Sequence, residues 1–161
     1  KDMKKINNKA FTLIELLVVI AIIAVLVTIV IIAINPLKLI QDSQDARMRA
    51  DLNQIKAAFQ LYYNENKNYP SGTTMPSSGG CWSSGGGCTG TIYMKQVPEN
   101  VSGGNYLYQG FNGATACNSG TCTDYAVGAI LFNPNTEDGN TLTKCTNTDG
   151  VSTATFEVCN D

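Results

Sequence analysis

The feature that most constrains this chain is a long apolar stretch near its N-terminus. Residues Leu16 to Ile34 occupy nineteen consecutive positions, and only Thr28 interrupts the apolar run. A helix of this length spans about 28 Å, close to the hydrocarbon thickness of a bilayer. A buried strand is excluded because strands seldom exceed about ten residues. The stretch therefore predicts a membrane-crossing helix, in which the Thr28 hydroxyl bonds a carbonyl one turn back.

The flanks of the stretch set its expected orientation. A cleavable secretory signal has an apolar region of about 7 to 15 residues followed by a small-x-small site, and Ala33-Ile34-Asn35 is a poor match. A membrane-spanning helix is therefore favoured over a secretory signal. Lys4, Lys5 and Lys9 precede the stretch. The positive-inside rule then places the N-terminus in the cytoplasm and the residues after Asn35 outside.

Composition excludes several classes of function. The 161 residues include 11 Lys and Arg against 13 Asp and Glu, for a net charge of -2. Nucleic-acid binding is not indicated, because it requires a basic surplus. The chain has no His, which removes His-based acid-base catalysis, Ser-His and Cys-His nucleophile pairs and Cys/His zinc sites. We therefore expect no enzyme, no cofactor and no metal.

A specific motif lies at the start of the apolar stretch. Residues 11–23 have the sequence Phe-Thr-Leu-Ile-Glu-Leu-Leu-Val-Val-Ile-Ala-Ile-Ile, after a Lys-bearing leader that ends in Ala10. This segment resembles the N-terminus of type IV pilins and of the related pseudopilins of type II secretion, and the resemblance covers about residues 1–70. It implies that a membrane aspartyl prepilin peptidase cuts between Ala10 and Phe11 and methylates the new amino group. Ala10 stands where the family most often has Gly.

Glu15 is the one charged residue within this apolar segment. A lone carboxylate in a bilayer costs several kcal/mol unless it is paired. In a helix residue 15 lies one turn from residue 11, so the ammonium group freed at Phe11 can neutralise it. The resemblance implies that the pair forms between neighbouring subunits and sets their axial register. The alternative is an acid that snorkels to the lipid headgroups.

Pro36 and the residues after it predict a second, different helix. Proline has no N–H, so Pro36 kinks the helix or ends its first segment. Related pilins carry helix-disrupting prolines in this part of the stem, where stretching would let a filament extend under load. Beyond it, apolar residues recur at spacings of 4, 3, 4 and 3, which predicts an amphipathic helix that packs on the head. These residues are Met48, Leu52, Ile55, Phe59 and Tyr62. The segment Asn68-Tyr69-Pro70-Ser71-Gly72 ends the helix.

The C-terminal part has a different composition. All 15 Gly lie at or beyond Gly72 and all 6 Cys at or beyond Cys81. Ser71 to Gly90 is so rich in Gly, Ser and Thr that we expect a stapled surface loop without a core. Short runs bounded by turn residues follow and predict a small antiparallel sheet laid on the amphipathic helix. The runs are Thr91 to Val97, Asn105 to Gln109, Tyr125 to Phe132, Thr141 to Thr146 and Thr153 to Cys159.

Six cysteines permit fifteen pairings. We favour the pairs that close short loops, because these closures cost the least entropy. They are Cys81 with Cys88, Cys117 with Cys122, and Cys145 with Cys159. Three bridges compensate for a small core in an exported protein. Metal ligation by the cysteines is the rival hypothesis, and the absence of His together with the expected export disfavours it.

Two smaller motifs lie in the head. Glu137-Asp138-Gly139 and Asp149-Gly150 are acidic turns. Related secretion pseudopilins bind calcium in a loop of this region, but the alternating ligands of an EF-hand are absent here, so solvated turns are favoured. Asn100-Val101-Ser102 fits a glycosylation sequon, a pattern that also occurs by chance.

Together these features predict an α+β chain with a long N-terminal helix and a disulfide-stapled β head. We expect a leader at 1–10, a transmembrane or filament-core helix at 11–35, an amphipathic helix at 36–70 and the head at 71–161. The predicted function is the major subunit of a type IV pilus. The chain would sit in the inner membrane, then polymerise with the assembly machinery into an extracellular homo-oligomeric filament for adhesion, motility or DNA uptake. The alternatives are a type II secretion pseudopilin, favoured by the Tyr69-Pro70 junction, and a monomeric membrane-anchored binding module.

Overall fold

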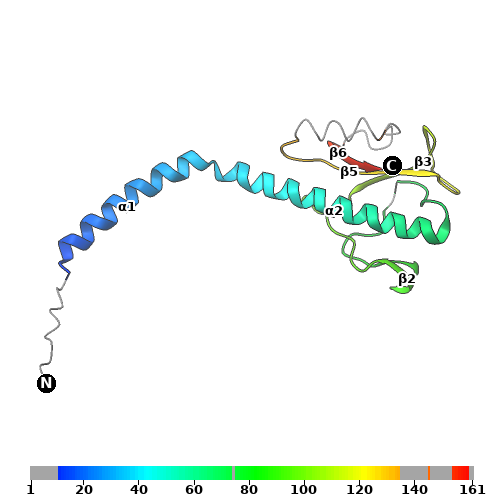
Figure 1. Ribbon diagram of the computed structural model, residues 1–161, viewed down its shortest axis with the longest axis horizontal. Helices are drawn as coiled ribbons and strands as arrows, with labels where there is room; N and C mark the ends of the chain where they lie inside the picture. The colour runs from blue at the N-terminus through cyan, green and yellow to red at the C-terminus, as the bar shows by residue number, and fades with distance from the viewer. Residues whose placement is uncertain (1–10, 74, 135–144, 146–153, 160–161) are drawn as a thin grey trace, which may run out of the picture. The chain divides into compact units, whose positions relative to one another are not determined.

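The structure is a computed structural model that describes residues 11–73, 75–134, 145 and 154–159 (Figure 1). Within these described residues, two helices precede six strands. The elements are α1 Leu13–Ile34, α2 Pro36–Asn66, β1 Trp82–Gly85, β2 Thr89–Met94, β3 Leu107–Asn112, β4 Thr115–Ala116, β5 Asp124–Ala129 and β6 Phe156–Cys159. The chain divides into two compact units, Lys1–Ile40 and Gln41–Asp161. The predicted fold class, long apolar helix followed by a small antiparallel β head, is confirmed.

The first unit contains α1 and the first residues of α2. Within the described part of the chain, α1 is the one helix long and apolar enough to cross a membrane. None of its side chains is buried. A helix that is apolar around its whole circumference has no polar face to turn to water, so its surroundings must be lipid or protein.

The second unit is organised by the apolar face of α2. Met48, Leu52, Ile55 and Phe59 are fully buried, and Tyr62 packs against the same cluster. Their alternating three- and four-residue spacing places them on one side of the helix, as predicted. The helix ends at Asn66, and Lys67 follows in the left-handed conformation with its N–H bonded to the Tyr63 carbonyl at 2.8 Å.

A four-stranded antiparallel sheet, in the order β4-β3-β5-β6, forms most of the head. Tyr108 on β3 pairs with Val127 on β5 and faces the α2 cluster. The opposite face carries a second, smaller cluster that includes Phe111 and Ala126. Four of the predicted runs overlap β2, β3, β5 and β6. Most of the run Thr141 to Thr146 lies outside the described residues.

The segment Ser71 to Gly90 is not the surface loop that its composition predicts. It contains β1, which pairs with β2 in a separate two-stranded hairpin. Met75 and Trp82 are buried in the main core, and the Trp82 ring lies 4.7 Å from the Phe59 ring. The prediction was wrong because two large apolar side chains suffice to anchor a glycine- and serine-rich segment onto an aromatic cluster.

Two buried acids of the head differ in their hydrogen bonding. Both carboxylate oxygens of Asp45 on α2 accept backbone N–H groups, from Phe132 at 2.8 Å and from Asn133 at 2.7 Å, and so tie the segment after β5 to the helix. Glu157 on β6 is 1% exposed, and neither of its carboxylate oxygens has a hydrogen-bond partner in the described part of the chain. Burial raises the pKa of Glu157 from 4.5 to about 7. The uncharged acid is therefore the form that the fold favours.

We predict that Glu157→Gln removes a pH dependence of head stability. Between about pH 4.5 and pH 7 the unfolded chain loses its Glu157 proton while the folded chain keeps it, so stability falls as pH rises through this window. The cost approaches about 3 kcal/mol above pH 7. Denaturant unfolding of the detergent-solubilised protein at pH 5 and pH 8 should show this loss in the wild type and much less in Glu157→Gln. Equal pH slopes in both proteins would contradict the assignment.

Candidate functional site

The candidate site is the start of α1, where Thr12 is the N-cap of the helix. The Thr12 hydroxyl oxygen accepts the Glu15 backbone N–H at 3.3 Å. In return, Glu15 Oε2 accepts the Thr12 backbone N–H at 3.1 Å and the Thr12 hydroxyl at 2.8 Å. This reciprocal arrangement is a capping box, which satisfies donors that a helix start otherwise leaves unpaired.

The capping box gives Glu15 partners within its own chain. Sequence reasoning assigned Glu15 a cation and gave Thr12 no role, although the Thr-x-x-Glu spacing is the signal of a capping box. Phe11 precedes the cap and is 74% exposed. Ala10, the other residue of the predicted cut, lies outside the described residues. The carboxylate also lies in the first turn of α1, where the partial positive charge of the helix stabilises an anion.

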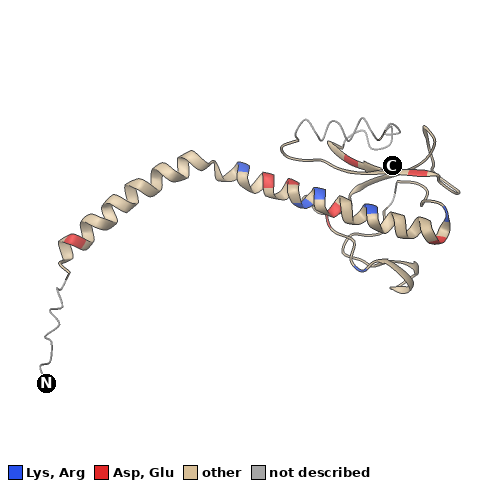
Figure 2. Cartoon of the chain, viewed as in Figure 1, with Lys and Arg blue, Asp and Glu red and all other residues tan. Residues whose placement is uncertain are grey.

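Beyond Glu15 the helix offers a continuous apolar surface. Glu15 is the one charged residue on α1, and Figure 2 shows this helix in tan apart from red near its start. A shallow apolar depression runs along one side and is lined by Leu17, Val18, Ala21, Ile22, Val25 and Leu26. The Thr28 hydroxyl donates to the carbonyls of Ala24 at 3.0 Å and Val25 at 2.7 Å, which confirms its predicted local role. A surface this large and apolar is typical of a membrane or protein contact.

The helix is interrupted between Ile34 and Pro36 (Figure 1). Asn35 adopts a left-handed conformation, with φ 45° and ψ 75°. Asparagine tolerates this conformation better than most residues, and a helix commonly ends in it. Pro36 has no N–H to donate, so the hydrogen-bond ladder of α1 stops here and α2 begins. The Lys38 N–H restarts the ladder by donating to the Asn35 carbonyl at 3.1 Å.

The six cysteines form three disulfides in the second unit, and the pairs are those favoured from loop length. Cys81–Cys88 joins the residue before β1 to the residue before β2, and Cys117–Cys122 closes the turn between β4 and β5. Cys145–Cys159 attaches the end of β6. The acidic turns at 137–139 and 149–150 lie outside the described residues. Within the described ranges no group of three His, Cys, Asp or Glu side chains could hold a metal.

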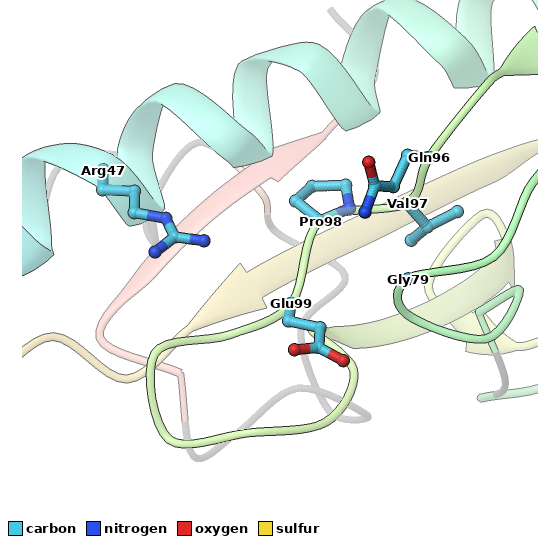
Figure 3. Close-up of a pocket in the computed structure, with 6 residues that line it drawn as sticks. All are labelled: Arg47, Gly79, Gln96, Val97, Pro98 and Glu99. Atoms are coloured by element: carbon cyan, nitrogen blue, oxygen red, sulfur yellow. The ribbon is translucent and has the colours of Figure 1, made fainter.

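A polar depression of about 370 Å³ lies between α2 and the loop after β2. Figure 3 shows Arg47 extending from α2 beside Pro98 and Glu99 of that loop. Asp51 accepts the Tyr106 hydroxyl at 2.8 Å and lies 3.7 Å from the Arg47 Nε. Burial and this hydrogen bond to a carboxylate raise the pKa of Tyr106. Its hydroxyl therefore stays protonated and acts as a hydrogen-bond donor to Asp51.

The comparison with protein families agrees with the geometry of the helix start. Residues 5–34 match the family model of the prokaryotic N-terminal methylation motif. The match supports a type IV pilin-like or pseudopilin class, and the motif implies a prepilin peptidase substrate in a pilus-assembly context. The apolar helix fits membrane anchoring in that family. No curated protein and no solved structure gives a significant match.

We predict that the Thr12 hydroxyl stabilises the first turn of α1. Thr12→Val keeps the side-chain shape but removes the acceptor for the Glu15 N–H and a donor to its carboxylate. The loss should cost about 1 kcal/mol and accelerate amide exchange at Glu15 about fivefold. Hydrogen exchange of the full chain in detergent measures this, with Thr12→Ser as the matched control that retains the hydroxyl. Wild-type exchange in Thr12→Val would mean that the capping box contributes nothing.

Proposed function

We propose that this chain is the major structural subunit of a type IV pilus. The observation that carries the proposal is the start of α1, where one carboxylate at the helix N-terminus precedes an apolar surface with no buried side chain. An anchor needs only the apolar surface. A charged group placed one turn after the expected cut gives each subunit, in addition, a point that a neighbouring amino terminus can bind.

In this proposal the subunit waits in the inner membrane and then moves into a helical fibre. Lipid tails and the apolar side chains of neighbouring helices are similar surroundings for α1, so transfer from bilayer to fibre is close to balance. A small directed input from the assembly machinery can then drive growth. In this proposal the N-terminus is cytoplasmic before assembly. Lys4, Lys5 and Lys9 precede the apolar helix, and positively charged flanks remain on the cytoplasmic side.

The head forms the outer surface of the proposed fibre. Its disulfides suit an exported protein that must stay folded outside the cell. We propose that the chain acts by assembly and not by catalysis. A type II secretion pseudopilin is the second candidate, because Tyr69-Pro70 follows the stem helix as it does in that branch. Long surface fibres purified from the cells would favour the pilus.

We predict that Glu15→Gln abolishes fibre assembly while the protein remains in the membrane. The amide has the same shape but no charge to attract a neighbouring ammonium group. Glu99→Gln, at an exposed acid of the head, is the matched control and should assemble normally. The measurement is the amount of sheared surface fibre relative to membrane-bound subunit. A monomeric anchor would tolerate both changes equally, so normal fibres from Glu15→Gln would refute the charge-pair mechanism.

We also predict the covalent form of the assembled subunit. Subunits from sheared fibres should begin at an N-methylated Phe11, because removal of the leader exposes the ammonium group that Glu15 requires. Three disulfides should make each subunit six hydrogens lighter than the reduced chain. Intact mass with and without reductant, together with N-terminal sequencing, measures both. Native fibres whose subunits still carry Ala10 would exclude the proposed pair.

A further inference from the structure

The sequon Asn100-Val101-Ser102 lies in a compact loop between β2 and β3. Asn100 Oδ1 accepts the backbone N–H of Ser102 at 3.1 Å, which forms an Asx turn. The Gly103 N–H donates to the Asn100 carbonyl at 2.8 Å, and the Asn100 N–H donates to the Gly104 carbonyl at 3.1 Å. The main-chain polar groups of the turn are therefore largely satisfied locally.

The turn presents the amide nitrogen of Asn100. Asn100 is partly exposed and Ser102 is exposed, whereas Val101 packs against the main core and holds the loop in place. Because the turn occupies Oδ1, the side chain can rotate little without losing a hydrogen bond. The Nδ2 group donates no hydrogen bond to any residue of the described ranges.

The surface beside Asn100 is polar. The depression between α2 and this loop is lined by Arg47, Gln96 and Glu99, whose side chains offer both donors and acceptors, and also by Gly79, Val97 and Pro98 (Figure 3). A hydroxyl-rich substituent on Asn100, the residue after Glu99, would start next to these hydrogen-bonding groups. The loop is also distant in sequence from the helix start that the proposed assembly uses.

We propose that Asn100 is the acceptor of an N-linked glycan. In the transfer, a bond forms between Asn100 Nδ2 and C1 of the first sugar. The bond between C1 and the pyrophosphate of a polyprenol-linked oligosaccharide breaks, Nδ2 releases a proton, and the lipid pyrophosphate leaves. The Ser102 hydroxyl is the second sequon element that the transfer requires. This inference rests on the proposed function in one respect, which is that the head is exported.

The test is the intact mass of the protein purified from its native cells, compared among four chains. The wild type should carry added mass in hexose or aminosugar increments, and peptide fragmentation should locate it on Asn100. Asn100→Gln and Ser102→Ala should lose this mass completely. Ser102→Ala keeps the backbone N–H that closes the Asx turn, so it removes the sequon without removing the turn. Ser102→Thr is the matched control, since it keeps the hydroxyl and should keep the mass.

The same spectra separate this inference from the proposed function. Subunits that start at methylated Phe11 and carry three disulfides, but have the mass of the unmodified chain, would overturn the glycan and leave the pilus proposal standing. Added mass located on any residue other than Asn100 would also overturn it. Glycan-bearing protein that stays monomeric in the membrane would support the modification and overturn the fibre.

Discussion

An ionised carboxylate is unstable among aliphatic side chains unless donors surround it, and Glu15 is where this chain meets that constraint. Thr12 supplies its N–H and its hydroxyl from the same chain, so a subunit need not wait for a partner to be stable. These bonds already have an ionised acceptor, but both donors are neutral. In the proposed pilus, an incoming ammonium group would add a full positive charge beside the carboxylate, which neither Thr12 donor carries. This added charge would favour the assembled subunit over the free one, while the Thr12 bonds keep the free subunit stable.

The core of the small head is built around one aromatic side chain of α2. Phe59 of α2 lies within about 5 Å of three aromatic rings, at 4.7 Å from Trp82, 5.0 Å from Tyr108 and 4.5 Å from Tyr125. These rings come from the hairpin and from the larger sheet, so one helix residue joins both sheets. Aromatic side chains bury much area per residue. Cys117 and Cys122 are buried in the same core cluster, so their disulfide lies in the core with these rings.

The sequence predicted the features that depend on local pattern. Helical spacing identified the buried face of α2, and short apolar runs identified β2, β3, β5 and β6. Trp82 was missed because its burial depends on Phe59, a residue of another element that composition cannot bring near it. The position of Glu157 within a strand was predictable, but its burial depends on which face of β6 is covered. Thr12 carries a local signal that can be read from the sequence, because Thr-x-x-Glu is the spacing of a capping box.

The interruption at Asn35 and Pro36 separates two helices that require different surroundings. The side chains of α1 need apolar surroundings on every side, whereas α2 has one buried face and exposes charged residues on the other. Helix order propagates through consecutive hydrogen bonds, and the ladder of α1 stops at a proline that cannot donate. A change in the surroundings of α1 therefore need not disturb the hydrogen bonds of α2. The aromatic core beneath Phe59 can keep its packing while the apolar helix exchanges lipid for protein.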